Sequence, residues 1–183
     1  MIPRMPAPRS PHTLYLLRHA KSSWADPALA DRDRPLAPRG RRNAAVLAAE
    51  LARIPIAPEL VLCSPARRTR ETLDAISDEL PQGAEIRFEE RVYGASAEGL
   101  VDLLAGLPGA VASVLLIGHN PGLQRLALLL AGRGDAPVLT RLAAKFPTAA
   151  IARLAFSGRR WRDLDAGAAE LKQLWSPKDG DGG

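Results

Sequence analysis

Short apolar runs that alternate with longer amphipathic stretches are the feature of this sequence that most constrains its fold. The pattern predicts strands at 13–18, 58–64, 85–89, 112–118, 149–156 and 160–165, and helices at 39–53, 65–80, 97–107 and 121–132. Strands that alternate with helices favour a mostly parallel sheet with both faces covered. We therefore expect an α/β fold, a three-layer sandwich whose central sheet is flanked by helices.

The chain has the length of one domain. With 183 residues, of which 46% are hydrophobic, it is long enough to bury a continuous core. Residues 1–12 contain four prolines and no apolar run, so we expect a flexible arm rather than a secretion signal. The domain is predicted to occupy residues 13–178, followed by a flexible glycine-rich tail at 179–183.

The charge of the chain indicates what kind of ligand to expect. The net charge is +5, and the basic surplus is concentrated in residues 1–42. Nucleic-acid sites usually interleave basic with aromatic residues, and only 4% of this chain is aromatic, so arginines around one loop suit a small anion better. No apolar run approaches the ~20 residues needed to cross a bilayer. The single cysteine, Cys63, excludes an internal disulfide and favours a reducing compartment, so we expect a cytoplasmic protein without nucleic-acid or membrane partners.

Three predicted strands end in residues that suit anion binding. The first ends in Arg18 and His19, the second in Ser64 with Arg68 shortly behind it, and the third in the GHNPG motif that contains His119. The carboxyl ends of parallel strands line one crevice at a sheet edge, which is where ligands bind in open α/β folds. All three motifs are therefore expected to converge there.

The second motif also resembles a helix start. Ser64 suits the N-cap and Pro65 the first helical position, which would leave backbone N–H groups free to bind an anion. Thr72, four residues after Arg68, lies on the same helix face and can support it, whereas Arg67 and Arg70 point elsewhere.

Two arginines and two histidines around one crevice suit phosphoryl transfer. Guanidinium groups bind phosphoryl oxygens in a bidentate manner, and a histidine with a pKa near ~6.5 is largely neutral and able to attack phosphorus. The sequence contains no H-x-H or H-E-x-x-H pattern typical of a metal site. We therefore expect neither a metal ion nor a cofactor.

These motifs resemble a known family. The segments LLRHA, SPARRTRET and GHNP, in that order, are similar to the histidine phosphatase (phosphoglycerate mutase-like) superfamily. The segments RHAKSSW, DRDRPLAPRG and VYGASAEGL resemble its SixA-type phosphohistidine phosphatase branch. The resemblance implies a phosphoglycerate mutase-like fold in which His19 is the nucleophile, Arg18 and Arg68 grip the phosphoryl oxygens, and His119 donates to them.

Five further residues are candidates for substrate binding. By analogy with relatives, Lys21 and Ser22 either touch phosphate or belong to a solvated loop. Ser64 either adds a hydrogen bond or caps its helix, and Asn120 follows the second histidine in the turn. Arg34, with Arg39 as its alternative, is expected at the pocket rim, where it reaches a protein substrate.

Members of the superfamily that cleave phosphate esters use a carboxylic acid to protonate the departing alkoxide. Glu89, Glu90 and Glu98 lie near the corresponding part of this chain, but none sits in the motif of those enzymes. Imidazole departs from phosphohistidine as a neutral ring, so the missing acid agrees with a P–N substrate.

We therefore predict a metal-independent phosphatase that acts on protein phosphohistidine, with a phosphorelay or phosphotransfer-system protein as its partner. A small-molecule phosphomonoesterase and a non-catalytic phospho-binding module are the alternatives.

Two other residues have simpler explanations. His12 lies in the predicted arm and is expected to be structural. Cys63 precedes an arginine, as in cysteine phosphatases, but Arg68 follows after four residues rather than the five which that class requires. Cys63 is therefore predicted to be a buried strand residue.

Overall fold

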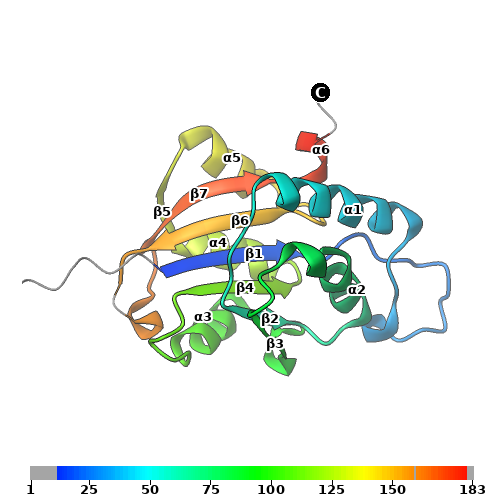
Figure 1. The fold of residues 1–183 in the computed structure, drawn as a ribbon, viewed down its shortest axis with the longest axis horizontal. Coiled ribbons are helices and arrows are strands. Elements are labelled where there is room, and N and C mark those ends of the chain that lie inside the picture. Colours follow the sequence, from blue (N-terminus) through cyan, green and yellow to red (C-terminus); the bar gives the residue numbers. More distant parts are fainter. Residues whose placement is uncertain (1–11, 159, 181–183) are drawn as a thin grey trace, which may run out of the picture.

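Strands and helices alternate along most of the computed structural model, which describes residues 12–158 and 160–180 (Figure 1). The strands are β1 (His12–Arg18), β2 (Leu60–Cys63), β3 (Glu85–Phe88), β4 (Ser113–Gly118), β5 (Ala131–Gly134), β6 (Ile151–Phe156) and β7 (Ala169–Trp175). The α-helices are α1 (Pro38–Arg53), α2 (Arg67–Ile76), α3 (Ala97–Ala105), α4 (Gly122–Leu130), α5 (Ala136–Ala144) and α6 (Pro177–Gly180). Short 3-10 helices are η1 (Asp31–Asp33), η2 (Ser77–Glu79), η3 (Glu90–Val92) and η4 (Trp161–Asp163).

Within the described residues the strands form one seven-stranded sheet in the order β3-β2-β4-β1-β6-β7-β5. β1, β2, β3 and β4 are mutually parallel neighbours, and β5 is parallel to β7, whereas β6 runs antiparallel to both β1 and β7. The predicted α/β class and mostly parallel central sheet are confirmed.

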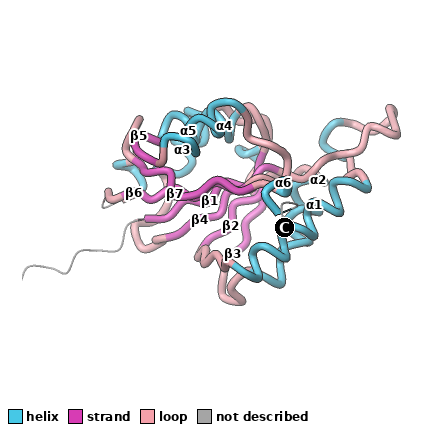
Figure 2. The backbone as a smooth tube through the Cα atoms, turned by 90° about the horizontal axis from the view of Figure 1, so that it is seen from above, coloured by secondary structure: helices cyan, strands magenta, loops and turns pink. Residues whose placement is uncertain are grey.

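Helices cover both faces of the sheet (Figure 2). Alternate residues of β1 divide between two cores: Leu14 and Leu16 pack with α3, α4 and α5, while Tyr15 and Leu17 pack with α1 and α2. This division follows from the two-residue period of a strand, and each fully buried leucine contributes roughly 1.5–3 kcal/mol. The central strands are thus held from both sides, which fixes the position of their ends.

The C-terminal third of the chain differs from the sequence prediction. Residues 160–165, predicted as a strand, contain η4 instead, and β5, α5 and β7 were not predicted. In β7 the pairing register with β6 shifts around Lys172, so that Leu171 and Leu174 both face the α3–α4 core although they are three residues apart. This irregularity breaks the alternation by which a strand is recognised in a sequence.

The described ends of the chain are anchored more firmly than expected. His12, predicted to belong to the arm, is the first residue of β1 and is buried, while the rest of the arm lies outside the described residues. Asp179, assigned to the tail, lies in α6 and forms an ion pair with Arg141 at 2.7 Å. In the part of the chain that the structure describes, no helix is long and apolar enough to span a membrane.

Candidate active site

The three motifs predicted to converge do lie together. β1, β4 and β2 are adjacent and parallel, so their carboxyl ends meet at one edge of the sheet, where their arrowheads point in Figure 1. His19, Ser64 and His119 are the first residues after these three strand ends. Because backbone hydrogen bonds fix the strands relative to one another, they also fix the backbone positions of these three residues.

His19 presents one ring nitrogen as a free base. The residue is 9% exposed, and its Nδ1 lies 2.7 Å from the carbonyl oxygen of Ala20. Since a carbonyl oxygen only accepts hydrogen bonds, Nδ1 carries the proton and Nε2 keeps its lone pair. The backbone N–H of His19 also donates to the carbonyl of Gly118 at 3.1 Å, which ties this residue to β4.

His119 lies beside His19 and has a partner on each ring nitrogen. The ring centroids of the two histidines are 5.2 Å apart. Nδ1 of His119 lies 3.3 Å from an Nη of Arg68, and Nε2 lies 2.7 Å from Oγ of Ser64. A guanidinium group only donates, so Nδ1 accepts and Nε2 carries the proton that it donates to Ser64.

The surroundings keep both histidines neutral at pH 7. Burial lowers the pKa of His19 to about 3; the hydrogen bond to Ala20 acts against this shift, and the charges of Arg68 and Arg18 add to it. Burial, followed by the charge of Arg68, lowers the pKa of His119 to about 4. His19 therefore has the protonation state that a nucleophile requires.

Arg68 reaches this pair from the first turn of α2. Its side chain is almost fully buried. It donates to two groups of Asp31, the backbone carbonyl and, at 2.9 Å, the carboxylate. Thr72 supports it as predicted: its Oγ1 donates to the Arg68 carbonyl at 2.6 Å and accepts from the backbone of Ala20 at 3.0 Å. The same hydroxyl thus links α2 to the residue that follows the nucleophile.

Arg18 and Asn120 are anchored to a common acceptor. The carbonyl of Phe146 accepts from an Nη of Arg18 at 2.8 Å and from Nδ2 of Asn120 at 3.2 Å. Among the described residues, Nε of Arg18 and Oδ1 of Asn120 are buried without a hydrogen-bond partner. Unpaired buried polar atoms are rare in native proteins, and two of them here indicate a functional region.

Sequence reasoning missed two residues of the site, Asp31 and Tyr93. The Asp31 carboxylate accepts from Arg68, from Arg34 at 2.9 Å and from the Tyr93 hydroxyl at 2.9 Å. Burial alone would raise the pKa of Asp31, but the hydrogen bonds from Tyr93 and Arg68 outweigh it and lower that pKa to about 2. The Tyr93 ring stands edge-on to His119, with centroids 5.5 Å apart. Asp31 lies in the motif DRDRPLAPRG and Tyr93 in VYGASAEGL, and these two motifs are the sequence signal that could have identified them.

Arg34 and Ser22 occupy positions that differ from the sequence expectation. Arg34 was expected to extend from the pocket rim, yet it is 6% exposed and is held inside the loop. One of its Nη atoms donates to Oγ of Ser22 at 2.7 Å, so these two predicted substrate contacts face each other. The Lys21 side chain is exposed, and the adjacent Gly40 is packed so closely that a Cβ there would lie 2.0 Å from the Lys21 carbonyl oxygen.

The predicted helix start at Ser64 is wrong. α2 begins at Arg67 with Ala66 at its N-cap position, and no side chain caps it. Ser64 instead turns its hydroxyl to His119, which is the hydrogen-bonding alternative that the sequence left open. As expected, Arg67 points away from the site and pairs with Glu71 at 2.7 Å.

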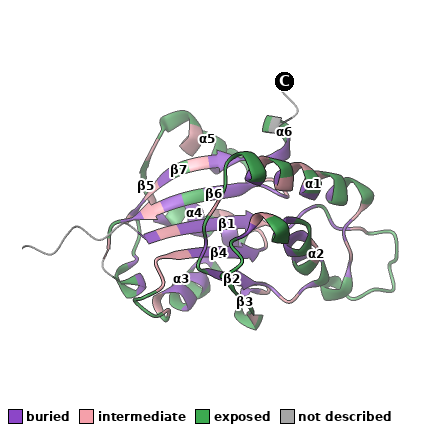
Figure 3. Cartoon of the chain, viewed as in Figure 1, coloured by how far each residue is buried: buried purple, intermediate pink, exposed green. Residues whose placement is uncertain are grey.

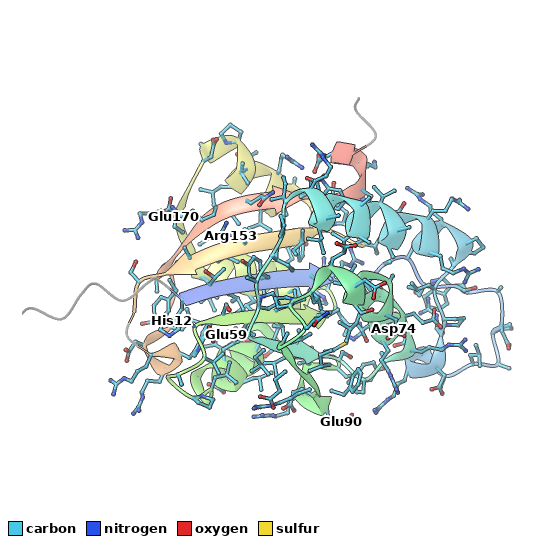
Figure 4. The ribbon with its side chains drawn as sticks, in the orientation of Figure 1. His12, Glu59, Asp74, Glu90, Arg153 and Glu170 are labelled. Atoms are coloured by element: carbon cyan, nitrogen blue, oxygen red, sulfur yellow. The ribbon has the colours of Figure 1, made fainter. Side chains whose placement is uncertain are left out.

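The three candidate acids have hydrogen-bond partners other than the histidine pair. Glu89 is hydrogen-bonded to Arg91, which keeps its pKa below the usual value, and Glu90 pairs with Arg32 at 2.6 Å near the lower margin in Figure 4. Glu98 is exposed in the first turn of α3, and hydrogen bonds at that helix start lower its pKa. None of the hydrogen bonds of these three side chains within the described residues involves either histidine.

Other candidate centres have structural explanations. His12 lies at the far end of β1 (Figure 4), where it bonds the Gly158 carbonyl at 3.0 Å and packs edge-on against Trp161. Cys63 is buried in β2 as predicted, and burial raises its pKa to about 12. Across residues 12–158 and 160–180, no three His, Cys, Asp or Glu side chains are grouped in a way that could hold a metal ion.

Comparison with known proteins agrees with this geometry. Residues 14–112 match the model of the histidine phosphatase superfamily, branch 1. The chain belongs to this superfamily. An uncharacterized protein of Mycobacterium tuberculosis (strain H37Rv) is 39% identical over 165 residues, which span 88% of this chain and all of that protein. Membership in the superfamily supports phosphatase activity.

Solved structures place the chain close to the SixA-type branch. A protein assigned as the phosphohistidine phosphatase SixA of Nakamurella multipartitia is 30% identical, with a TM-score of 0.79 over 93% of this chain and 98% of that one. The protein histidine phosphatase SixA in complex with tungstate is 25% identical, with a TM-score of 0.72 over 91% of this chain and 98% of that one. The family resemblance and the phosphoglycerate mutase-like fold predicted from the sequence are confirmed.

Proposed function

We propose that this superfamily member removes the phosphoryl group from phosphohistidine in a phosphorelay or phosphotransfer protein, through a phosphohistidine intermediate on His19. The observation that carries the proposal is the neutral His19, whose Nε2 keeps its lone pair and whose ring lies beside His119 and near the charges of Arg68 and Arg18.

The bound phosphoryl group would be held by charge rather than by a metal ion. Arg18 and Arg68 donate to its oxygens, and the burial of Arg68, with the partial burial of Arg18, strengthens these bonds. A bound dianion also raises the pKa of His119, because it stabilises the imidazolium form. The arrival of substrate thereby converts His119 from a neutral ring into an imidazolium, whose positive charge and second N–H stabilise the charge that develops in the transition state.

The first step exchanges one P–N bond for another. Nε2 of His19 attacks phosphorus with its lone pair, and the substrate imidazole leaves with the electrons of the broken P–N bond. Because the substrate ring is protonated on its other nitrogen, it departs as neutral imidazole.

The second step is hydrolysis of the intermediate. The Nδ1–H of His19, which donates to Ala20, gives phosphorylated His19 the same protonated form, so His19 also departs as a neutral ring when water attacks phosphorus. Phosphate is released and Nε2 recovers its lone pair.

The choice of a P–N substrate rests on the carboxylates near the site. Departure of an alkoxide requires a proton donor, whereas departure of imidazole does not. Asp31, which contacts Arg68, has a pKa of about 2 and is therefore ionised at neutral pH. Glu89 forms an ion pair with Arg91, and Glu90 forms one with Arg32. Similarity to SixA, which is named a protein histidine phosphatase, adds support.

Turnover and phosphoenzyme trapping test the proposal. Phosphohistidine protein and an aryl phosphate are each supplied to the native protein, His19→Ala and His12→Gln, with and without a chelator. We expect preferential release of phosphate from the phosphohistidine protein, an acid-labile phosphoenzyme, and loss of both with His19→Ala alone. His12→Gln is the matched control, because His12 lies at the opposite end of β1.

Each contrary outcome identifies a different error. Loss of activity on chelation contradicts the metal-free mechanism, and preference for the aryl ester favours a small-molecule phosphomonoesterase. Tight binding of phosphoprotein without turnover indicates a binding module.

A further inference from the structure

The loop between β1 and α1 carries a large apolar side chain in solvent. Every residue at positions 24–33 is exposed, and this loop extends beyond the sheet at the right of Figure 3. Trp24 is 74% exposed, whereas the two other tryptophans, Trp161 and Trp175, are 0% and 7% exposed. An indole in that position has no role in the core, although indole groups are among the commonest anchors of protein interfaces.

The position of Trp24 is fixed rather than free. The Arg34 guanidinium lies 3.2 Å from the centroid of the indole ring, a cation–π contact that covers one ring face. That guanidinium is itself immobilised by the Ser23 carbonyl at 2.9 Å, by Ser22 Oγ at 2.7 Å and by the Asp31 carboxylate at 2.9 Å. The buried arginine thus acts as a rigid support that presents the other face of Trp24 to solvent.

Arg34 also connects Trp24 to the candidate active site. Asp31 binds Arg34 through one carboxylate oxygen and Arg68 through the other, and Arg68 contacts His119. Three side chains therefore link the indole to the histidine pair, and the contacts recorded for Trp24 within the described residues do not include either histidine. A ligand that contacts both must extend from the pocket across the loop.

We infer that Trp24 is the docking contact for the protein that carries phosphohistidine, an inference that rests on the proposed function. A histidine side chain is short, so insertion of its phosphorylated ring brings the partner backbone onto this loop. A small phosphate ester has nothing that reaches so far. Trp24 therefore contributes to recognition of the protein rather than of the phosphoryl group.

The charges around Trp24 indicate which surface fits it. Lys21 lies on the same loop, and Arg39 flanks Gly40, which packs against the Lys21 backbone. Lys21 and Arg39 are exposed and, like Asp26 and Asp33 on the loop itself, take part in no ion pair within the described residues. The complementary surface has an apolar side chain for the indole and, on the side of Lys21 and Arg39, acidic residues.

Kinetics with two substrates test this inference. Native protein, Trp24→Ala, Trp24→Phe and Ile54→Ala are each assayed with a histidine-phosphorylated phosphotransfer domain and with free phosphohistidine. Ile54 is the matched control because it is an apolar residue, 47% exposed, at the far end of α1. We expect Trp24→Ala to raise KM for the protein about tenfold, with kcat unchanged and free phosphohistidine unaffected. Trp24→Phe should restore most of the loss.

Fluorescence supplies a readout that is independent of turnover. In a His19→Ala background, binding of the phosphorylated domain should shift the Trp24 emission to shorter wavelength and protect it from acrylamide, whereas inorganic phosphate should do neither. The assignment is simple, because Trp161 and Trp175 are buried.

The outcomes separate the inference from the function on which it rests. If native protein turns over the phosphorylated domain and Trp24→Ala does so equally well, docking at Trp24 is overturned and the function stands. An equal loss with both substrates also overturns docking, since Trp24 then acts on the pocket through Arg34. Absence of turnover with either phosphohistidine substrate contradicts the proposed function, and the partner assignment with it.

Discussion

The two halves of the candidate site are held in place in different ways. His19, Ser64 and His119 follow directly from neighbouring parallel strands, so the backbone ladder of the sheet determines where they begin. The opposite half is the loop that carries Asp31, whose position depends on hydrogen bonds from side chains distant in sequence. The strand-end half is therefore rigid as soon as the sheet forms, whereas the loop half becomes ordered only when Arg68 and Tyr93 are in place.

This difference assigns the two halves separate tasks. Chemistry requires groups held within a fraction of an ångström, which a sheet edge provides. Selection of a partner varies among enzymes that share the same chemistry, and a loop tolerates such variation without disturbing the sheet. Arg68 is one residue at which the two halves meet, because it contacts both His119 and Asp31, and Tyr93 is another.

Substitution of Arg68 should have the largest effect on activity. Arg68→Lys retains the charge but loses the planar fork that contacts Asp31 and His119 together. We expect kcat/KM for phosphohistidine to fall by about 10²–10³-fold, the cost of losing one preorganised donor. Arg67→Lys is the control, because Arg67 is exposed on the same helix turn. If the two variants behave alike, Arg68 does not grip the phosphoryl group.

Breaking the loop half alone should cost less. Asp31→Asn removes the charge that orients Arg68 and Arg34, and we expect kcat/KM to fall by about 10–100-fold, as when a supporting residue is lost from a site. Asp33→Asn, on the same 3-10 turn and exposed, should change little. An increase in activity would show instead that Asp31 competes with phosphate for Arg68.

The sequence predicts the strand-end half because its signals are local. Each motif directly follows an apolar run, and the rule that parallel strands share one ligand-binding edge brought Arg18, His19 and His119 together. The loop half has no such signal. The pairing of Asp31 with Tyr93 joins residues 62 positions apart, and that of Arg68 with Asp31 joins residues 37 apart. Only three-dimensional packing reveals these contacts.

The same reasoning explains the errors elsewhere. Arg34 was expected to reach a protein substrate from the pocket rim, yet three acceptors in its own loop hold it inside. Strand β7 escaped recognition because its register shift near Lys172 breaks the alternation of apolar residues. In each case a local preference was overridden by a contact that the local sequence does not encode.

The stability of the strand-end half should depend on pH. His19 has a pKa of about 3 in the folded protein and about 6.5 when unfolded, so below pH 6.5 the unfolded chain binds a proton that the folded one does not. The free energy of unfolding therefore falls as the pH drops, by about 2 kcal/mol between pH 7 and pH 5 for His19 alone. Asp31, whose pKa is lowered from 3.8 to about 2, stabilises the folded state at neutral pH, and this contribution is lost only as the pH falls through that range.

Urea unfolding of native protein and His19→Asn at pH 7 and pH 5 measures this contribution. The variant should lose less stability on acidification, with His119 accounting for part of the remaining loss because its pKa is about 4. An equal loss in both proteins would contradict the burial of a neutral His19.

The smallest effect is expected where the loop half touches the histidine pair. Tyr93→Phe removes the hydroxyl that donates to Asp31 at 2.9 Å but keeps the ring that stands against His119. Asp31 retains its bonds to Arg68 and Arg34, so we expect kcat/KM to fall only about two- to fivefold, the value of one partly solvated hydrogen bond. Tyr93→Ala removes the ring as well and should cost more, since His119 then loses its neighbour. Equal losses in the two variants would assign the whole contribution to the hydroxyl, and the loop half would then act on the histidine pair through hydrogen bonds alone.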